Sequence, residues 1–417
     1  MEILIENCII QGREKKEKSI LIEDNKIIKI GEIKGEFDYI IDGENKVAIP
    51  GLINTHTHTA MTMLRGIADD LPLDKWLNNH IWPYEAEHLD PEFCYIGSLL
   101  GCLEMIKSGT TCFFDLYFFE DSTFRAVEKS GMRAFLSQGI LDFPTPEYKA
   151  GEAIDVAEKF IKKFKDKNER IKPALGPHAP NTCSKETLIE TRELAEKYKL
   201  KIHIHISETK NEVEQIIKKT GMRPVEYLDD IDFLGNDVTA AHCIWLNDNE
   251  IKILKRKGVC VSHNQISNMK LASGIAPIPK MLDSGINVTL GTDGCASNNN
   301  LDMFEEMKTT ALLHKVNLLD PTVMSAEKII EMATTSAYRA LDLNCGIEEG
   351  KLADLILIDL KKPHLTPLHN INSHIVYSAN GSDVDTVIVA GKILMENREV
   401  KTLNEEEILE KAKEIAE

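Results

Sequence analysis

Two histidine pairs are the clearest candidates for chemistry in this sequence. His56 and His58 follow directly on the apolar run 47–52, and His203 and His205 alternate with isoleucines in 202–206. Side chains two residues apart on a strand point to the same side, so both imidazoles of a pair can converge on one ion. One such pair alone is as often a polar strand end as a metal site. Whether these pairs bind a metal must therefore be judged from the residues around the other apolar runs.

Three further polar side chains stand directly after apolar runs. Glu208 follows the run 201–206, His242 ends the run 238–241, and Asp293 follows the run 287–290. Imidazole and carboxylate groups are metal ligands and also transfer protons. Whether they act together depends on the elements that carry them.

Eight short runs rich in β-branched residues alternate with helical stretches. They are 47–52, 110–114, 133–136, 173–176, 201–206, 238–241, 259–262 and 287–290. Amphipathic segments such as 154–164, 185–198 and 251–257 lie between successive runs. Strands that alternate with helices indicate parallel βα units buried on both faces. The pattern predicts an α/β fold, a (β/α)₈ barrel over residues 50–345.

The two ends of the chain carry a different pattern. Short strands are predicted in 1–49, and strand patterns resume in 346–417 before a terminal helix rich in Glu and Lys. We expect the two ends to form one small β-sandwich beside the barrel.

The barrel fold would bring the polar strand ends together, because the carboxyl ends of its strands surround one cavity. Three neutral imidazoles and a carboxylate suit Zn²⁺ with an open position for water. We predict four ligands: His56, His58, His205 and Asp293. His203 is the rival of His205; otherwise it is a buried histidine of the core or one that supports the ligands.

Composition excludes several partners. The formal net charge is -18, with no basic stripe to offset it, which argues against nucleic acid. No apolar run approaches the roughly 20 residues that span a bilayer, and the acidic N-terminus is no secretory signal. Nine scattered cysteines without a Cys-x-x-Cys pair suggest a reducing compartment. The sequence predicts a cytoplasmic enzyme that acts on a small molecule and contacts no membrane.

The chain resembles the amidohydrolase superfamily, and within it the 5′-methylthioadenosine/S-adenosylhomocysteine deaminases. The matching stretches are PGLINTHTH (50–58), LRGIADD (64–70), GPHAP (176–180), HISE (205–208), LASG (271–274), GTDG (291–294) and GKLADL (350–355). The chain departs at Gln265, where relatives commonly carry proline. Binuclear relatives use a lysine on strand four, but here that strand ends in Gly176-Pro177-His178, so the resemblance implies one ion, Zn²⁺, with Fe²⁺ or another divalent ion as the alternative.

The resemblance implies hydrolytic deamination of an adenosine-type nucleoside by a homo-oligomer. The ion would lower the pKa of water from about 15.7 toward 7 for attack on C6 of the purine. Glu208 is similar to the residue that delivers a proton to N1, and Asp293 to the base that accepts the proton of water. His242 is similar to the histidine that orients the nucleophile; the alternative is a metal ligand.

Three residues are implied to contact the substrate. His178 would reach the purine edge, and Glu85 would accept both ribose hydroxyls; its alternative is a solvated carboxylate at a helix start. Gln138 stands where relatives that use S-adenosylhomocysteine place arginine. We therefore expect 5′-deoxyadenosine and 5′-methylthioadenosine to be better substrates than S-adenosylhomocysteine, with adenosine also in range.

Two other functions remain open from the sequence. One is hydrolysis of another ring, such as guanine, cytosine, a triazine or a cyclic amide; Glu208 with His178 favours a purine, and Glu85 favours an attached ribose. The other is a metal-binding barrel without catalysis, which the intact set of predicted ligands and proton-transfer residues argues against.

Overall fold

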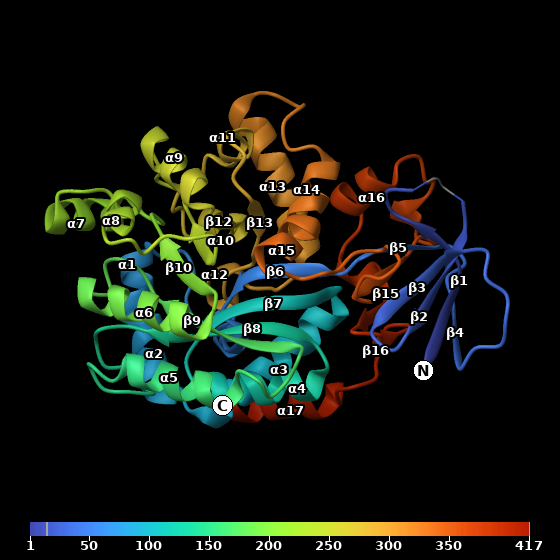
Figure 1. Ribbon diagram of the computed structural model, residues 1–417, viewed down its shortest axis with the longest axis horizontal. Coiled ribbons are helices and arrows are strands. Elements are labelled where there is room, and N and C mark those ends of the chain that lie inside the picture. The colour runs from blue at the N-terminus through green and yellow to red at the C-terminus, as the bar shows by residue number, and fades with distance from the viewer. Residues whose placement is uncertain (14–15, 417) are drawn as a thin grey trace.

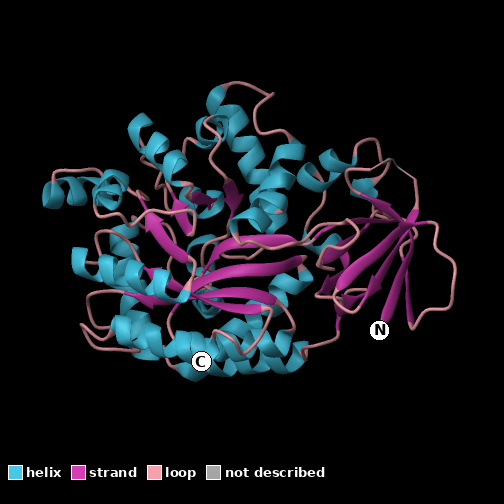
Figure 2. Ribbon diagram, viewed as in Figure 1, coloured by secondary structure: helices cyan, strands magenta, loops and turns pink. Residues whose placement is uncertain are grey.

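Two sheets organise the chain, an eight-stranded parallel sheet ringed by helices and a nine-stranded sheet at one side (Figures 1 and 2). The computed structural model describes residues 1–13 and 16–416. In the part of the chain that it describes, no helix is long and apolar enough to cross a membrane.

The eight-stranded sheet is the predicted barrel. Its strands run in chain order: β6 (Leu52–Thr57), β7 (Thr110–Tyr117), β8 (Arg133–Ile140), β9 (Ile171–Pro177), β10 (Ile202–Ile206), β11 (Val238–His242), β12 (Cys260–His263) and β13 (Val288–Leu290). The last strand meets the first through hydrogen bonds from Thr55 Oγ1 to the Leu290 carbonyl, at 2.8 Å, and from Asp293 N to the His56 carbonyl, at 2.9 Å. The (β/α)₈ prediction is confirmed.

The prediction of the first barrel strand was wrong. The run 47–52 belongs to two strands, because β5 (Lys46–Pro50) pairs antiparallel with β14 (Leu355–Asp359) in the nine-stranded sheet and β6 begins at Leu52. Gly51 separates them, and a Cβ there would lie 2.2 Å from Thr111 Oγ1. The chain passes from one sheet to the other at a position where only glycine fits.

The helices connect successive strands and cover the outside of the barrel (Figure 2). They are α3 (Pro91–Lys107), α4 (Glu120–Ser130), α5 (Ala153–Phe164), α6 (Lys185–Tyr198), α7 (Lys210–Thr220), α8 (Pro224–Asp230), α9 (Asp248–Lys257), α10 (Gln265–Lys270), α11 (Ile278–Asp283), α12 (Cys295–Asn298), α13 (Met303–Leu318), α14 (Ala326–Ala333) and α15 (Thr335–Ala340). The sequence determines several ends locally. Helix α9 starts at a capping box of Asn247 with Glu250 and stops at Gly258, which adopts φ +73.

Between β6 and α3 the chain forms an insertion of short helices. These are η1 (Thr59–Leu64), α1 (Leu73–Trp76), the π-helical turn η2 (Leu77–Ile81) and α2 (Trp82–His88). Leu73, Trp76, Leu77, Trp82 and Glu85 from this insertion line the cavity at the carboxyl end of the barrel. The insertion therefore forms part of the wall of the candidate site.

Both ends of the chain build the nine-stranded sheet. Besides β5 and β14 it contains β1 (Glu2–Ile10), β2 (Lys18–Glu23), β3 (Lys26–Gly31), β4 (Tyr39–Asp42), β15 (Val384–Val389), β16 (Lys392–Glu396) and β17 (Glu399–Val400). Ile3 and Ile5 of the first strand share one apolar core with Leu355 and Leu357, so the two ends pack together as predicted.

The segments after β14 complete the fold. They include η3 (Pro363–Leu365), α16 (Ile371–Tyr377), η4 (Gly381–Asp383) and the terminal helix α17 (Glu405–Ala416). Helix α17 lies along α3 (Figure 1), where Lys107 Nζ bonds Glu405 Oε1 at 2.6 Å.

Candidate functional site

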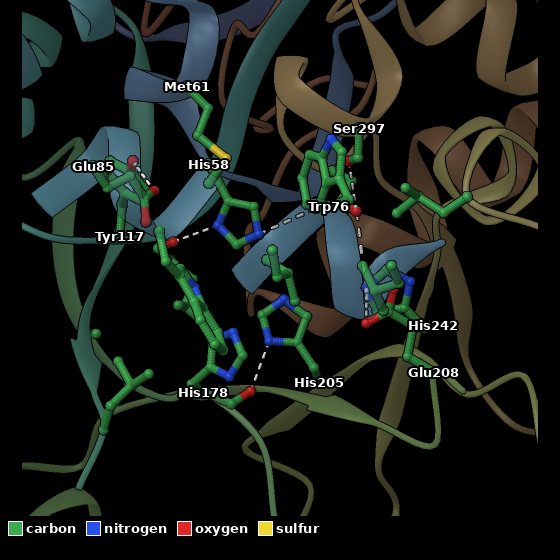
Figure 3. Close-up of a pocket in the computed structure, with 18 of the residues that line it drawn as sticks. His58, Met61, Trp76, Glu85, Tyr117, His178, His205, Glu208, His242 and Ser297 are labelled. Carbon is green, nitrogen blue, oxygen red and sulfur yellow. Dashed lines mark hydrogen bonds and ion pairs between the residues drawn. The ribbon is translucent and has the colours of Figure 1, made fainter. Parts of the chain in front are cut away.

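One cavity at the carboxyl end of the barrel holds most of the predicted site residues (Figure 3). It is lined by His58, Met61, Leu73, Trp76, Leu77, Trp82, Glu85, Leu116, Tyr117, Phe118, Gly139, Leu141, His178, His205, Glu208, His242, Leu271, Asp293 and Ser297. His56 is fully buried directly behind this wall, its ring centroid 4.9 Å from that of His58. The structure thus brings together predicted site residues that are up to 237 positions apart in the chain, from His56 to Asp293.

A group of donor atoms suited to a metal ion stands at the base of the cavity. His56, His205, His242 and Asp293 each offer an atom within 4.8 Å of the others. His56 Nε2 is buried and has no hydrogen-bond partner. A buried nitrogen without a partner costs free energy, and a cation at this point would satisfy it.

His58 was predicted as a ligand but is not part of that four-residue group. Its Nε2 nevertheless lies 3.1 Å from Asp293 Oδ1, and His56 Nε2 lies 3.3 Å from the same oxygen. Tetrahedral ligands about 2.0–2.1 Å from an ion are about 3.3 Å from one another. His242 Nε2 is 3.9 Å from Asp293 Oδ2. The spacing to the aspartate therefore favours His58 over His242.

Hydrogen bonds to backbone carbonyls fix two of the imidazoles. His58 Nδ1 lies 2.5 Å from the carbonyl of Leu116, and His205 Nδ1 lies 2.7 Å from the carbonyl of His178. A carbonyl can only accept, so Nδ1 carries the proton in both rings. In the neutral ring this leaves Nε2 with the lone pair, which is the tautomer that binds a metal through Nε2.

His203 lies behind His56. Its Nε2 is 2.7 Å from His56 Nδ1, its ring stacks on Phe114 at 4.3 Å, and it is fully buried. His203 is absent from the cavity lining. His203 is therefore positioned to orient His56. On the same strand, His205 is the histidine that lines the cavity.

Asp293 presents one carboxylate oxygen to the histidines and has the other occupied. Oδ2 accepts hydrogen bonds from Ser267 Oγ at 2.6 Å and Ser297 Oγ at 3.1 Å. Burial alone would raise the pKa of Asp293, but the imidazoles of His56 and His58 beside it hold the pKa well below the usual range. The carboxylate is therefore charged and aimed at the imidazoles through Oδ1.

The same charge acts on His58. Burial lowers the pKa of His58, but the hydrogen bond and the charge of Asp293 outweigh burial and raise it to about 9. For His56 burial prevails and lowers the pKa to about 3. A bare cluster of this kind retains a proton beside the carboxylate, and a divalent cation would replace that proton.

His242 and Glu208 stand next to this group. His242 Nδ1 lies 2.8 Å from Asn268 Oδ1, and its Nε2 is 3.9 Å from Glu208 Oε2. Burial raises the pKa of Glu208. A carboxyl group with a raised pKa beside a histidine can transfer protons near neutral pH.

Glu85 and His178 both line the cavity, and the His178 ring centroid lies 4.8 Å from that of His205. Glu85 is 4% exposed, which rules out a solvated carboxylate, and burial raises its pKa to about 7. Tyr117 Oη donates a hydrogen bond to Glu85 Oε1 (Figure 3). Burial lowers the pKa of His178 to about 4, so this ring is neutral; its Nδ1 lies 3.0 Å from Thr182 Oγ1.

Gln138 is the one predicted contact residue that the structure places elsewhere. It is 1% exposed, does not line the cavity, and donates from Nε2 to Glu147 Oε2 at 2.6 Å. Strand β8 continues to Ile140 instead of ending at residue 136, and alternation along it turns Gly139 toward the cavity and Gln138 away.

The sequence interpretation missed Tyr117, Ser267 and Asn268. The predicted second strand stopped at residue 114, whereas β7 runs to Tyr117, so a side chain at the carboxyl end of a barrel strand went unnoticed. That position was the available signal. Ser267 and Asn268 lie on α10, and nothing in the sequence indicates that they reach Asp293 and His242.

The chain belongs to the amidohydrolase family, whose model matches residues 47–394. It is 55% identical to the 5′-deoxyadenosine deaminase of Methanocaldococcus jannaschii, over 100% of this chain and 99% of that protein. It is 53% identical to the protein of the same name from Methanothermobacter thermautotrophicus, over 94% and 93% of the two chains. A solved adenosine deaminase from Xanthomonas campestris with bound zinc aligns with a TM-score of 0.96 and 33% identity, covering 99% of this chain and 97% of that one.

Proposed function

We propose that this enzyme deaminates the adenine ring of adenosine-type nucleosides by hydrolysis, with 5′-deoxyadenosine and 5′-methylthioadenosine as favoured substrates. The observation that carries the proposal is that one cavity combines a donor cluster for a metal, Glu208 beside that cluster, and the buried carboxyl group of Glu85. The names of the relatives support the same reaction and the same nucleoside.

His56, His58, His205 and Asp293 would hold one Zn²⁺, which supplies Lewis acidity and activates water as the nucleophile. The 3.1 Å and 3.3 Å contacts to Asp293 Oδ1 support this set, as does the zinc in the Xanthomonas campestris structure. His242 is then free to orient the attacking water. Replacement of His242 by Asn should keep the metal and lower kcat.

Proton transfer falls to Glu208 and Asp293. Glu208, whose pKa burial raises, donates to N1 of the purine as the ring loses aromaticity. Asp293 accepts a proton from the attacking water and passes it to the leaving amine. The bond from C6 to oxygen forms, the bond from C6 to the amino nitrogen breaks, and the remaining hydroxyl proton returns to Glu208, which yields the inosine analogue and ammonia.

The other residues that line the cavity would bind the substrate. Neutral His178 faces the purine edge, and Glu85 accepts the ribose hydroxyls. Trp82, Phe118 and Leu141 also line the cavity, so its wall is largely apolar there. No cationic side chain is present among the lining residues to hold an amino-acid carboxylate, which favours small uncharged 5′ groups.

The test is incubation of the zinc-loaded enzyme with a panel of adenine and guanine nucleosides, following ammonia and the change from adenine to hypoxanthine absorbance. We expect kcat/KM for 5′-deoxyadenosine and 5′-methylthioadenosine to exceed that for S-adenosylhomocysteine by about 10-fold, the value of one hydrogen bond to a charged group. Ammonia from guanosine but not from adenosine analogues would contradict the proposal.

We also infer that the enzyme works in the reducing interior of the cell as a homo-oligomer. All nine cysteines are free and buried, which supports the first part. Sedimentation of the purified protein tests the second, and a monomer at micromolar concentration would contradict it.

A further inference from the structure

Tyr117 is a buried phenol whose position is fixed at both ends. It is the last residue of β7, lines the cavity and is 3% exposed. Its backbone N–H donates to Glu120 Oε1 at 3.2 Å, and its hydroxyl donates to Glu85 Oε1. A phenol on a barrel strand is a more rigid support than a side chain on a loop.

Glu85 depends on this phenol. In residues 1–13 and 16–416, Tyr117 is the one side chain that donates to its carboxyl group, and no cation of this part pairs with it. Burial disfavours the charge of Glu85, and the hydrogen bond from Tyr117 acts in the opposite direction. One oxygen, Oε1, is therefore occupied, and Oε2 remains for a ligand that brings its own hydroxyl donor.

Tyr117 itself is unsuited to proton transfer. Burial and the neighbouring Glu85 raise its pKa well above the ordinary value, so the hydroxyl keeps its proton at all working pH values. Its ring lies 6.1 Å from that of His58, centroid to centroid, at a tilt of 46°. The phenol thus contacts Glu85 through its hydroxyl while its ring lies beside the His58 imidazole.

We propose that Tyr117 is a positioning residue that holds Glu85 in one orientation for the sugar hydroxyls, so that the pair selects ribonucleosides over 2′-deoxyribonucleosides. This inference rests on the proposed function. A vicinal diol can donate to the free oxygen of Glu85 only if the carboxyl group does not rotate. Without the phenol the carboxyl group loses its fixed donor, and recognition of the second hydroxyl weakens first.

The test compares 5′-deoxyadenosine with 2′,5′-dideoxyadenosine as substrates of the parent enzyme and of Tyr117→Phe. We expect the parent to prefer the ribose form by about 10-fold or more in kcat/KM, and the variant by less than about 3-fold. The loss should appear in KM for 5′-deoxyadenosine, with kcat changed by less than about 3-fold. A general loss of structure would instead lower both substrates alike.

Tyr84→Phe is the matched control, since it removes a hydroxyl from the residue next to Glu85 that stacks on His88 outside the cavity. It should keep the parent's preference. Glu85→Gln should lose the preference as Tyr117→Phe does, and the double variant should lose no more, which keeps the inference testable if one variant folds poorly.

Two results would overturn the inference while leaving the proposed function intact: a parent enzyme that deaminates both nucleosides equally well, or a Tyr117→Phe variant that loses the same factor on both. A parent enzyme that releases no ammonia from any adenine nucleoside would refute the proposed function, and this inference with it.

Discussion

The two ends of the barrel differ in how their buried charged side chains are paired. At the amino end, Arg133 at the start of β8 bonds Asp354 through Nε at 2.7 Å and Nη2 at 3.1 Å. Asp354 Oδ1 also accepts from Ala390 N at 2.7 Å. Both side chains are more than nine-tenths buried, and each charge faces its opposite. This end joins the barrel to the nine-stranded sheet.

At the carboxyl end three imidazoles crowd around one carboxylate, and their hydrogen bonds are incomplete. His56 Nε2 is buried and makes no hydrogen bond, although it lies 3.3 Å from Asp293 Oδ1, and the donor atoms of the cluster lie within 4.8 Å of one another. Backbone strain gathers here as well, because His242 and Asp293 adopt φ of 68 and 64. The buried arginine and aspartate at the amino end thus form a completed ion pair that joins two parts of the fold, whereas the imidazole cluster at the carboxyl end retains a donor atom that a cation could use.

The largest effect should come from removing a ligand. His205→Ala should lose the metal and all measurable activity, because the variant keeps too few donors for the ion. His203→Ala should retain most of the metal, since His203 lies behind His56, stacks on Phe114 and does not line the cavity. Metal content by mass spectrometry separates the two variants. Equal metal loss in both would show that the assignment of His205 is wrong.

The second largest effect on activity should come from Glu208→Gln. The variant keeps the shape of the side chain but cannot transfer a proton, so we expect kcat to fall by about 10²–10⁴-fold with the metal content unchanged. Steady-state kinetics together with metal analysis measure this. Activity within a few-fold of the parent would remove Glu208 from the reaction.

At the amino end a substitution should affect stability and not chemistry. Arg133→Met leaves Asp354 as an uncompensated buried charge, which we expect to cost about 3–5 kcal/mol in free energy of unfolding. The kcat of the folded fraction should stay at the parent value. Denaturant unfolding measures the cost. Lys162→Met is the control, because Lys162 pairs with Glu158 on an exposed helix face. A large drop in kcat without a change in stability would break the comparison between the two ends.

The smallest effect concerns pH. Burial raises the pKa of Glu208, and its role requires the protonated form, so kcat/KM should be maintained below that pKa and decline as the pH rises through it. The decline should lie above the ordinary range of a glutamate. It should be absent from the profile of Glu208→Gln. A parent profile that instead rises through this range would mean that Glu208 acts as its anion.

Much of the site could be predicted because most of its reactive side chains lie at the ends of strands. His56, Glu208, His242 and Asp293 each stand at or just after the end of a barrel strand, and barrel geometry makes those ends converge. The predicted position of Gln138 was wrong because its strand was predicted to end at residue 136, four residues before its actual end at Ile140.

Contacts between side chains of different elements could not be predicted. Ser267 and Ser297 both reach Asp293, and His263 pairs with His314 at 3.2 Å in the core, yet neither relation leaves a pattern along the chain. Within the apolar run 47–52, Pro50 and Gly51 signal a break between strands, but they do not show that the two parts belong to different sheets. The periodicity of apolar residues indicates which face of a helix or strand is buried. It does not show which other element packs against that face.

The most direct test of this account is reconstitution of the metal-free enzyme with zinc, measured as deamination of 5′-deoxyadenosine against zinc added per chain. Chelation should abolish turnover, and activity should return in proportion to zinc and reach its plateau at one equivalent. Full activity in the chelated protein, or a plateau only at two equivalents, would contradict a single catalytic ion held by His56, His58, His205 and Asp293.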